Sequence, residues 1–122
     1  MGTLADDIRE RFKWRKVVAP RPWLPAEVGE ELLGYYGGRT LRTGAFGQYE
    51  VVLVHVPLGG CFMLTGTHLI QLMDASGAAV GHPIRVVWQG VRDTAQGHKM
   101  KMFEVLVAEG EVIPEEFLPA VA

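Results

Sequence analysis

The stretch YYGGRTLRTGAFGQYEVVLVHV, residues 35–56, contains two strand-like runs separated by a glycine-rich turn. Residues 46–56, FGQYEVVLVHV, are rich in β-branched and aromatic side chains and predict one long strand. The run before the turn begins with ELLGYY, residues 31–36, and continues towards Leu41. Its glycines predict a bulge or a sharp bend, at which one strand can serve two sheets; they are Gly34, Gly37 and Gly38.

The rest of the chain extends this pattern to five strands and one helix. Residues 61–65, 84–89 and 100–108 predict the third, fourth and fifth strands. Residues 67–75, THLIQLMDA, have apolar side chains at helical spacing, with Thr67 as the expected N-cap and Gly77 as the stop. Residues 90–99 predict a polar loop.

The element order is therefore strand, strand, strand, helix, strand, strand. A coiled first strand and one short helix between the third and fourth strands are expected of an all-β, five-stranded OB-fold barrel. A small open α+β sheet is the alternative. We expect three regions: a basic N-terminal arm with a proline-rich connector (1–27), the OB-fold domain (28–109) and an acidic, partly apolar C-terminal tail (110–122).

Composition limits the function classes. The chain has 122 residues, enough for one domain, and its single cysteine, Cys61, excludes an internal disulfide. We see no signal peptide and no apolar run of about 20 residues, so we expect a soluble cytoplasmic protein. The net charge is −2, but eight of the 12 Lys and Arg residues lie in the first 42 positions, whereas the segment from Glu104 onward carries five glutamates and no cation. This asymmetry indicates a basic surface for a polyanion, or simply solvated charge.

At the level of the whole pattern, the chain resembles the OB-fold single-stranded DNA-binding proteins, particularly the small divergent ones of phages. The resemblance covers residues 28–108 and rests on VGEELLGYYGG, FGQYEVVLV, LTGTHLIQLM, GHPIRVVWQG and KMKMFEVLV. It implies a protein that coats single-stranded DNA during replication or recombination, in the host cytoplasm if a phage encodes it. It also implies that the loops joining strands one to two and four to five grip the nucleic acid.

Binding of a single strand without reading its sequence requires cations for the phosphates and exposed rings for the bases. The turn region supplies both: Arg39 and Arg42 are the cations, with no acid between them, and aromatic residues flank them on both sides. We therefore expect a nucleic-acid site, without cofactor or metal, made of Tyr36, Arg39, Arg42, Phe46, Tyr49, Arg85, Trp88, Arg92, Lys99, Lys101, Trp14, Arg15 and Lys16.

Several of these residues have a second interpretation. Period-two alternation divides the second strand into two faces, Tyr49–Val51–Leu53–His55 and Gln48–Glu50–Val52–Val54–Val56, and both are partly apolar. The sequence leaves open which face points inward. Trp88 can be a core side chain, and Lys99 and Lys101 can be a solvated pair that protects an edge strand. The arm can equally be a solvated charged helix, with Phe12 and Trp14 docked on the barrel.

Catalytic patterns are absent from the sequence. The four histidines are scattered without metal-ligand spacing, Cys61 lies in an apolar strand, and no phosphate-binding GxxxxGK[ST] loop occurs. We therefore expect a protein that is not an enzyme. Two rivals remain, an RNA-binding OB module and a non-catalytic adaptor that binds protein. We expect an irregular tail that packs on the barrel or on a second subunit. The tail also loosely resembles the acidic tails by which bacterial relatives recruit replication and recombination proteins. Self-association would favour cooperative binding.

Overall fold

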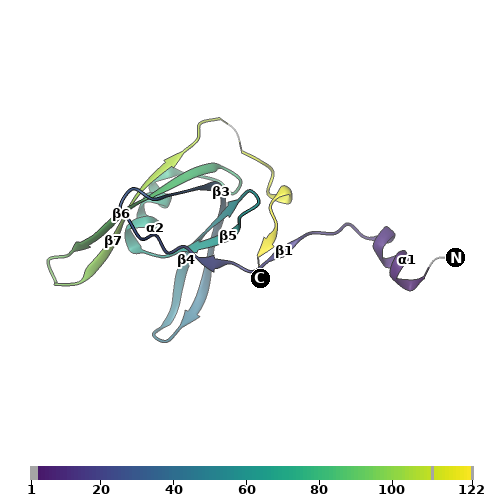
Figure 1. Ribbon diagram of the computed structural model, residues 1–122, viewed down its shortest axis with the longest axis horizontal. Coiled ribbons are helices and arrows are strands. Elements are labelled where there is room, and N and C mark those ends of the chain that lie inside the picture. Colours follow the sequence, from purple (N-terminus) through teal and green to yellow (C-terminus); the bar gives the residue numbers. More distant parts are fainter. Residues whose placement is uncertain (1–2, 111, 122) are drawn as a thin grey trace.

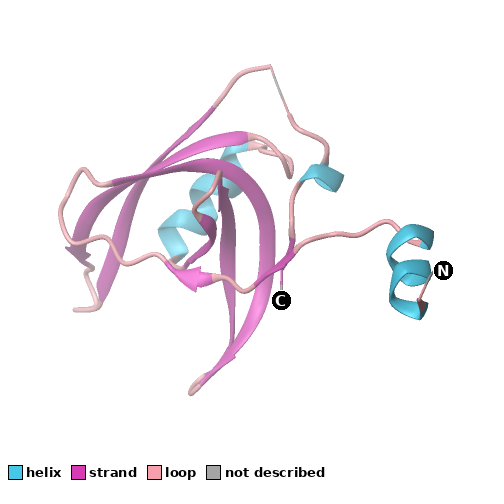
Figure 2. Ribbon diagram, turned by 45° about the vertical axis from the view of Figure 1, so that its right-hand side comes forward, coloured by secondary structure: helices cyan, strands magenta, loops and turns pink. Residues whose placement is uncertain are grey.

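Six strands form one open, strongly curved sheet in the computed structural model, which describes residues 3–110 and 112–121 (Figures 1 and 2). The strand order is β2-β5-β4-β3-β6-β7, so β2 and β7 are the edges. The strands are β2 (Arg21–Pro22), β3 (Glu31–Gly44), β4 (Gly47–Val56), β5 (Gly60–Leu64), β6 (Pro83–Asp93) and β7 (Lys99–Val107). Ladder hydrogen bonds among the described residues therefore do not close the sheet into a barrel.

The curvature begins in β3, which is long enough to pair with two neighbours. Its first part, Glu31–Tyr35, pairs with β6, and its second part, from Tyr35 to Gly44, pairs with β4. The register shifts between Tyr36 and Arg39, where Gly38 has a φ of +88° that only glycine adopts readily. The predicted bulge in this strand is confirmed. A second bulge lies in β6, between Trp88 and Gly90.

The main core lies between the inner face of the sheet and helix α2 (Thr67–Ser76). Leu69 and Met73 of the helix are buried among side chains of β3, β4, β6 and β7. His68 also ties the helix to β7, because its Nδ1 accepts a hydrogen bond of 3.0 Å from the Phe103 backbone N–H. A fully buried leucine such as Leu69 contributes about 2–5 kcal/mol relative to alanine, so the helix is a structural part of the core.

The second half of β4, residues 51–55, is buried on both faces. Val52 and Val54 face the main core, whereas Val51 and Leu53 form a second cluster with Cys61. Two short strands cover this second cluster, β1 (Val17–Val18) and β8 (Ala120–Val121), which pair in parallel. We call residues 15–18 and 115–121 the terminal clasp. The face that the sequence left open is therefore settled: the Val52 side points inward, and the Val51 side is covered by the chain ends.

Most predicted elements are confirmed, and three details differ. The N-cap of α2 is Gly66 and not Thr67. Half of the expected loop at 90–99 is strand, because β6 and β7 continue to a turn at residues 94–98. The tail is not wholly irregular, since it holds the 3₁₀ helix η1 (Glu115–Phe117) and β8; Glu111, one of its acids, lies outside the described residues.

The N-terminal arm begins with helix α1 (Leu4–Arg11), which extends away from the sheet in Figure 1. A capping box stabilises its first turn: the Asp6 backbone N–H donates to the Thr3 hydroxyl, and the Thr3 N–H donates to the Asp6 carboxylate. None of its residues is buried. The helix does not dock on the body of the molecule.

Candidate nucleic-acid interface

Two hairpins project from the sheet, one between β3 and β4 and one between β6 and β7 (Figure 1). Glycines with positive φ shape both turns: Gly47 at +110° and Gly97 at +78°. In the second turn, the Thr94 N–H donates to the His98 carbonyl at 2.8 Å, and the Gly97 N–H donates to the Thr94 carbonyl at 3.0 Å. These two hairpins correspond to the loops that the sequence predicted to contact nucleic acid.

The β3–β4 hairpin carries two exposed rings. Phe46 lies at the tip and is fully exposed, and Tyr49 is exposed over 42% of its surface. Tyr49 lies opposite Arg42 in the ladder, and its ring packs on Gly44, where a Cβ would meet the ring at 3.0 Å. Phe46 and Tyr49 are therefore available as stacking surfaces.

Arg39 does not extend from this hairpin as the sequence suggested. Its Nε lies 3.1 Å from Glu50 Oε1, and one of its terminal nitrogens lies 2.8 Å from Asp74 Oδ1. The sequence has no acid between Arg39 and Arg42, but the fold brings Glu50 of β4 and Asp74 of helix α2 to Arg39. The two carboxylates raise the pKa of Arg39, although burial opposes them. Its charge is already largely compensated within the protein.

Tyr36 is a core residue, which corrects its expected role as a stacking platform. It is only 7% exposed and packs among the buried side chains of the main core. Burial raises the pKa of its hydroxyl, and the nearby Arg39 opposes that shift. A base cannot stack on a ring that is enclosed in this way.

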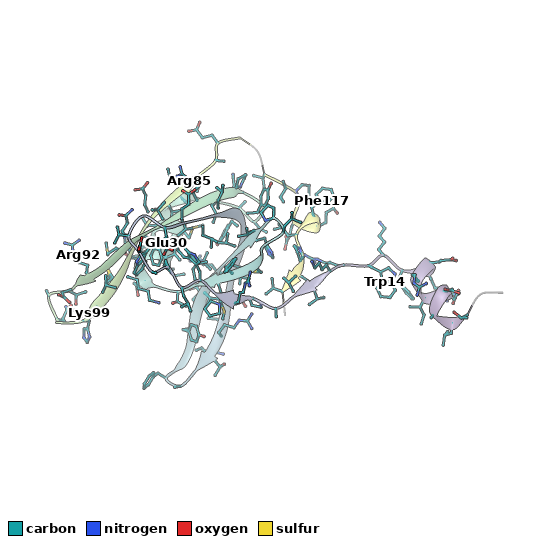
Figure 3. All side chains as sticks on the ribbon, viewed as in Figure 1. Trp14, Glu30, Arg85, Arg92, Lys99 and Phe117 are labelled. Atoms are coloured by element: carbon teal, nitrogen blue, oxygen red, sulfur yellow. The ribbon has the colours of Figure 1, made fainter. Side chains whose placement is uncertain are left out.

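The β6–β7 hairpin carries three of the predicted cations, and Figure 3 shows Arg92 and Lys99 near its end. Arg92 is exposed and makes no ion pair with a described residue. Lys99 forms an exposed ion pair with Asp93, with its Nζ 2.6 Å from Oδ1. Lys101 Nζ donates to the Thr65 hydroxyl at 3.0 Å. Exposed pairs of this kind exchange readily with water, so all three cations can meet phosphates.

An aromatic cavity lies where the edge of β5 approaches β6 and β7. It has a volume of about 290 Å³ and we call it the seam cavity. The Trp88 and Phe103 rings meet edge to face, with centroids 5.4 Å apart, and form one wall. The proline-rich connector supplies the opposite wall, held by a 3.0 Å hydrogen bond from the Trp23 N–H to the Met63 carbonyl. The lining residues are Trp23, Leu24, Pro25, Leu64, Thr65, Trp88, Val91, Lys101 and Phe103.

The seam cavity brings together side chains that the sequence treated separately. Trp88 and Lys101 were both predicted site residues, and they line the same cavity. Trp23 lines the same cavity beside Trp88 and Phe103, and it was not among the residues predicted for the site. The only signal in the sequence was a tryptophan between prolines, which indicates a fixed connector but not what the connector covers.

Arg85 lies on the outer face of β6, apart from the β6–β7 hairpin in Figure 3. It forms an ion pair with Glu31 on the adjacent strand, with Nη2 2.6 Å from Oε2. The hydrogen bond and the charge of Glu31 both raise its pKa. The structure therefore does not join Arg85 to the other cations.

The arm residues separate into two groups. Trp14 is exposed, donates its Nε1–H to the Arg9 carbonyl at 2.9 Å and touches the edge of Phe12. Arg15 instead donates two hydrogen bonds, of 3.2 and 3.1 Å, to the Leu118 carbonyl. The Lys16 carbonyl accepts from the Ala120 N–H at 2.8 Å. Arg15 and Lys16 thus hold the terminal clasp together, a contact that the sequence did not predict.

Across residues 3–110 and 112–121, the structure holds no group of three His, Cys, Asp or Glu side chains that could bind a metal ion. No helix in that part of the chain has the length and apolar character to cross a membrane. Comparison of the chain with protein-family models, with curated proteins and with solved structures found no match.

Proposed function

We propose that this protein binds single-stranded DNA without reading its sequence, as a non-catalytic protein of replication or recombination. The observation that carries the proposal is the seam cavity. Its two partly exposed rings, Trp23 and Trp88, adjoin Lys101 at the base of the hairpin that also presents Arg92. Aromatic rings can stack on bases, and neighbouring cations can bind the phosphates of the same strand. Both kinds of contact depend little on the base sequence.

The topology supports the same proposal. Strands β3 to β7, with α2 between β5 and β6, follow the order of a five-stranded OB barrel, in which the first strand pairs with the second and the fourth. We propose that the sheet is an OB barrel opened between β5 and β7, with the seam cavity at the opening. The β3–β4 and β6–β7 hairpins are then the loops that flank a bound strand, and Phe46 and Tyr49 add stacking surfaces.

Counterion release gives a direct test of the cations. Each phosphate contact with a single strand contributes about 0.7 to the slope of log affinity against log salt concentration. Arg92→Gln combined with Lys101→Gln should therefore lower the slope for an oligothymidylate by about 1.4, twice that value. Fluorescence anisotropy of a labelled oligonucleotide over a salt series measures the slope.

The matched control is Arg9→Gln combined with Arg11→Gln. These two arginines are also exposed but lie in helix α1, paired with Asp6 and Asp7. The control should retain the wild-type slope. Equal slopes for the wild type and the Arg92–Lys101 variant would remove the β6–β7 hairpin from the site.

A further inference from the structure

Helix α1 is amphipathic, and its apolar face is exposed. Leu4, Ala5 and Ile8 lie on one side of the helix, and Phe12 continues that side at the C-cap. Leu4 is 77% exposed and Phe12 is 57% exposed. An isolated helix shorter than about 12–15 residues is marginal in water, because most helical stability in proteins comes from packing of the apolar face. A helix of eight residues therefore needs a surface on which to pack.

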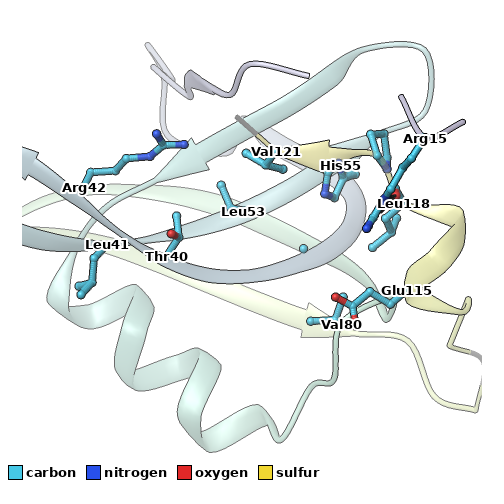
Figure 4. Close-up of a pocket in the computed structure, with 13 residues that line it drawn as sticks. Arg15, Thr40, Leu41, Arg42, Leu53, His55, Val80, Glu115, Leu118 and Val121 are labelled. Atoms are coloured by element: carbon cyan, nitrogen blue, oxygen red, sulfur yellow. Dashed lines mark hydrogen bonds between the residues drawn. The ribbon is translucent and has the colours of Figure 1, made fainter. Parts of the chain in front are cut away.

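Two contacts hold this helix away from its own body. Trp14 donates its Nε1–H to the Arg9 carbonyl, which ties the chain back to the helix. The next residue, Arg15, donates two hydrogen bonds to the Leu118 carbonyl of the clasp, and Figure 4 shows Arg15 beside Leu118. A single peptide link thus separates the contact with the helix from the contact with the body. The apolar face of α1 points to solvent, where a second molecule can reach it.

An apolar groove lies beside the point at which the arm leaves the body. It lies between the β4–β5 turn and η1 and has a volume of about 410 Å³; we call it the tail groove. Its apolar walls include Tyr35, Val56, Leu58, Ile113 and Phe117. Phe117, which Figure 3 labels, is mostly exposed. The tail groove and the seam cavity share no lining residue, so they are separate surfaces.

Leu58, at the edge of the tail groove, is not explained by folding. Its φ is +61°, in the left-handed region that a bulky side chain adopts only at a cost. The side chain is also fully exposed, so burial within its own chain does not offset that cost. Backbone strain at an exposed apolar residue suggests a function other than folding. An apolar side chain at the edge of an apolar groove is suited to contact a partner.

The charges of the arm and of the tail are complementary. Residues 1–16 carry five cations and three acids, and the two ion pairs within α1 leave this positive excess unchanged. The chain from Glu104 onward carries five glutamates and no cation. Glu115 and Glu116 lie in η1, directly before Phe117 of the tail groove. The tail of another copy therefore attracts the arm.

We propose that two copies of this chain exchange their arms, with the apolar face of α1 from each copy packed in the tail groove of the other. The exchange is reciprocal, because Lys16, at the end of each arm, lines the tail groove of its own copy. A two-fold arrangement therefore places each groove next to the arm of the other copy, and the interface closes at the dimer. In the dimer, Ile8 and Phe12 cover Leu58. The proposal does not depend on strand binding at the seam cavity.

Sedimentation equilibrium of the full chain without nucleic acid, over a series of concentrations, tests the proposal. We expect a monomer–dimer equilibrium. Ile8→Ser removes the centre of the apolar face and should weaken dimerisation by about tenfold or more. Glu10→Ser, on the opposite side of the same helix, is the matched control and should retain the wild-type dissociation constant. Because no residue of α1 is buried in the single chain, both variants should keep the fold of the body.

Leu58→Gly distinguishes a docking contact from a structural role. Glycine adopts a positive φ without strain, so the melting temperature of the dilute, monomeric protein should rise. Dimerisation should nevertheless weaken by about tenfold or more, because the partner helix loses an apolar contact. A leucine that only supported the turn would give the opposite pair of results, a lower melting temperature and unchanged dimerisation.

A chain that stays monomeric up to about 1 mM would overturn the proposal, whether α1 remains free or packs on its own groove. A dimer that Ile8→Ser leaves unchanged would assign the interface to another surface, and a dimer that Leu58→Gly leaves unchanged would exclude the tail groove; either result also overturns the proposal. Loss of strand binding with an intact dimer would refute only the proposed function.

Discussion

His55 links a single side chain to the acid stability of the whole protein. Its pKa is lowered in the folded state, so below the ordinary value of about 6.5 the unfolded chain binds a proton that the folded chain resists. Stability from this residue is fully present above pH 6.5 and is lost as the pH falls below it, by up to about 1.4 kcal/mol per pH unit.

Urea unfolding at pH 7.5 and 5.5 measures this effect. The wild type should lose more unfolding free energy between the two values than His55→Gln, whose side chain does not titrate. His68→Gln is not a suitable control, because His68 bonds to Phe103. His98→Gln is suitable, because the His98 side chain is exposed in the β6–β7 turn. An equal pH dependence in the wild type and His55→Gln would contradict the assignment.

Substitutions of Arg39 and Arg92 should have opposite effects: one should lower stability and leave DNA binding unchanged, and the other should do the reverse. Arg39→Gln removes ion pairs to Glu50 and Asp74, which are partly exposed, so we expect a loss of about 1 kcal/mol or less in unfolding free energy. The salt slope for single-stranded DNA should stay unchanged, since those acids already compensate the Arg39 charge.

Arg92→Gln should do the reverse: unchanged stability and a slope lower by about 0.7. Chemical denaturation and anisotropy, measured on both variants, give the two quantities. A lower slope for Arg39→Gln would show that Arg39 leaves its carboxylates to contact phosphate.

At the residue scale, the sequence predicted the exposure of a side chain where local neighbours determine it, but not where distant segments do. The exposed ring of Phe46 follows from its place beside the turn glycines. The burial of Tyr36 and the pairing of Arg39 with Asp74 depend on where helix α2 packs, more than 30 positions away in the chain. No local pattern carries that information.

At the scale of elements, the terminal clasp determines whether Cys61 is accessible. Cys61 lies beneath the clasp with Val51 and Leu53, and burial raises the pKa of its thiol. Leu118→Ser replaces the buried side chain next to the Arg15 contact and should loosen the clasp. We expect faster reaction of Cys61 with a thiol reagent in the native protein.

Phe117→Ser is the matched control, because Phe117 is the neighbouring residue and is mostly exposed. Its thiol reactivity should equal that of the wild type. Equal reactivity of Leu118→Ser and the wild type would show that the clasp does not protect Cys61. Circular dichroism of both variants verifies that the sheet remains folded.

The long strands could be predicted from the sequence because each has enough β-branched residues to show a pattern. The clasp could not, because β1 and β8 have two residues each and no period. The clasp also explains why the inward face of β4 could not be predicted. It buries the second face of this strand, so both faces are apolar. An apolar second face on a strand is therefore a signal that another segment covers it.

At the scale of the whole molecule, the end of the β6–β7 hairpin has a local excess of positive charge, because residues 91–101 carry three cations and one acid, Asp93. Arg92, Lys99 and Lys101 lie on the β6–β7 hairpin, whereas the glutamates of η1 lie in the clasp. A net charge of −2 is therefore compatible with a local basic surface. Binding through such a surface should be strong only at low salt, since the rest of the molecule repels a polyanion.

Tryptophan fluorescence titrated with an oligothymidylate of about 30 nucleotides, beside a duplex of equal length, tests the central claim most directly. Trp23 and Trp88 line the seam cavity and should report a bound strand. We predict saturable quenching by the single strand, a weak response to the duplex, and affinity that falls as salt is raised. Absence of any response to the single strand at low salt, together with unchanged anisotropy of the labelled oligonucleotide, would contradict the account.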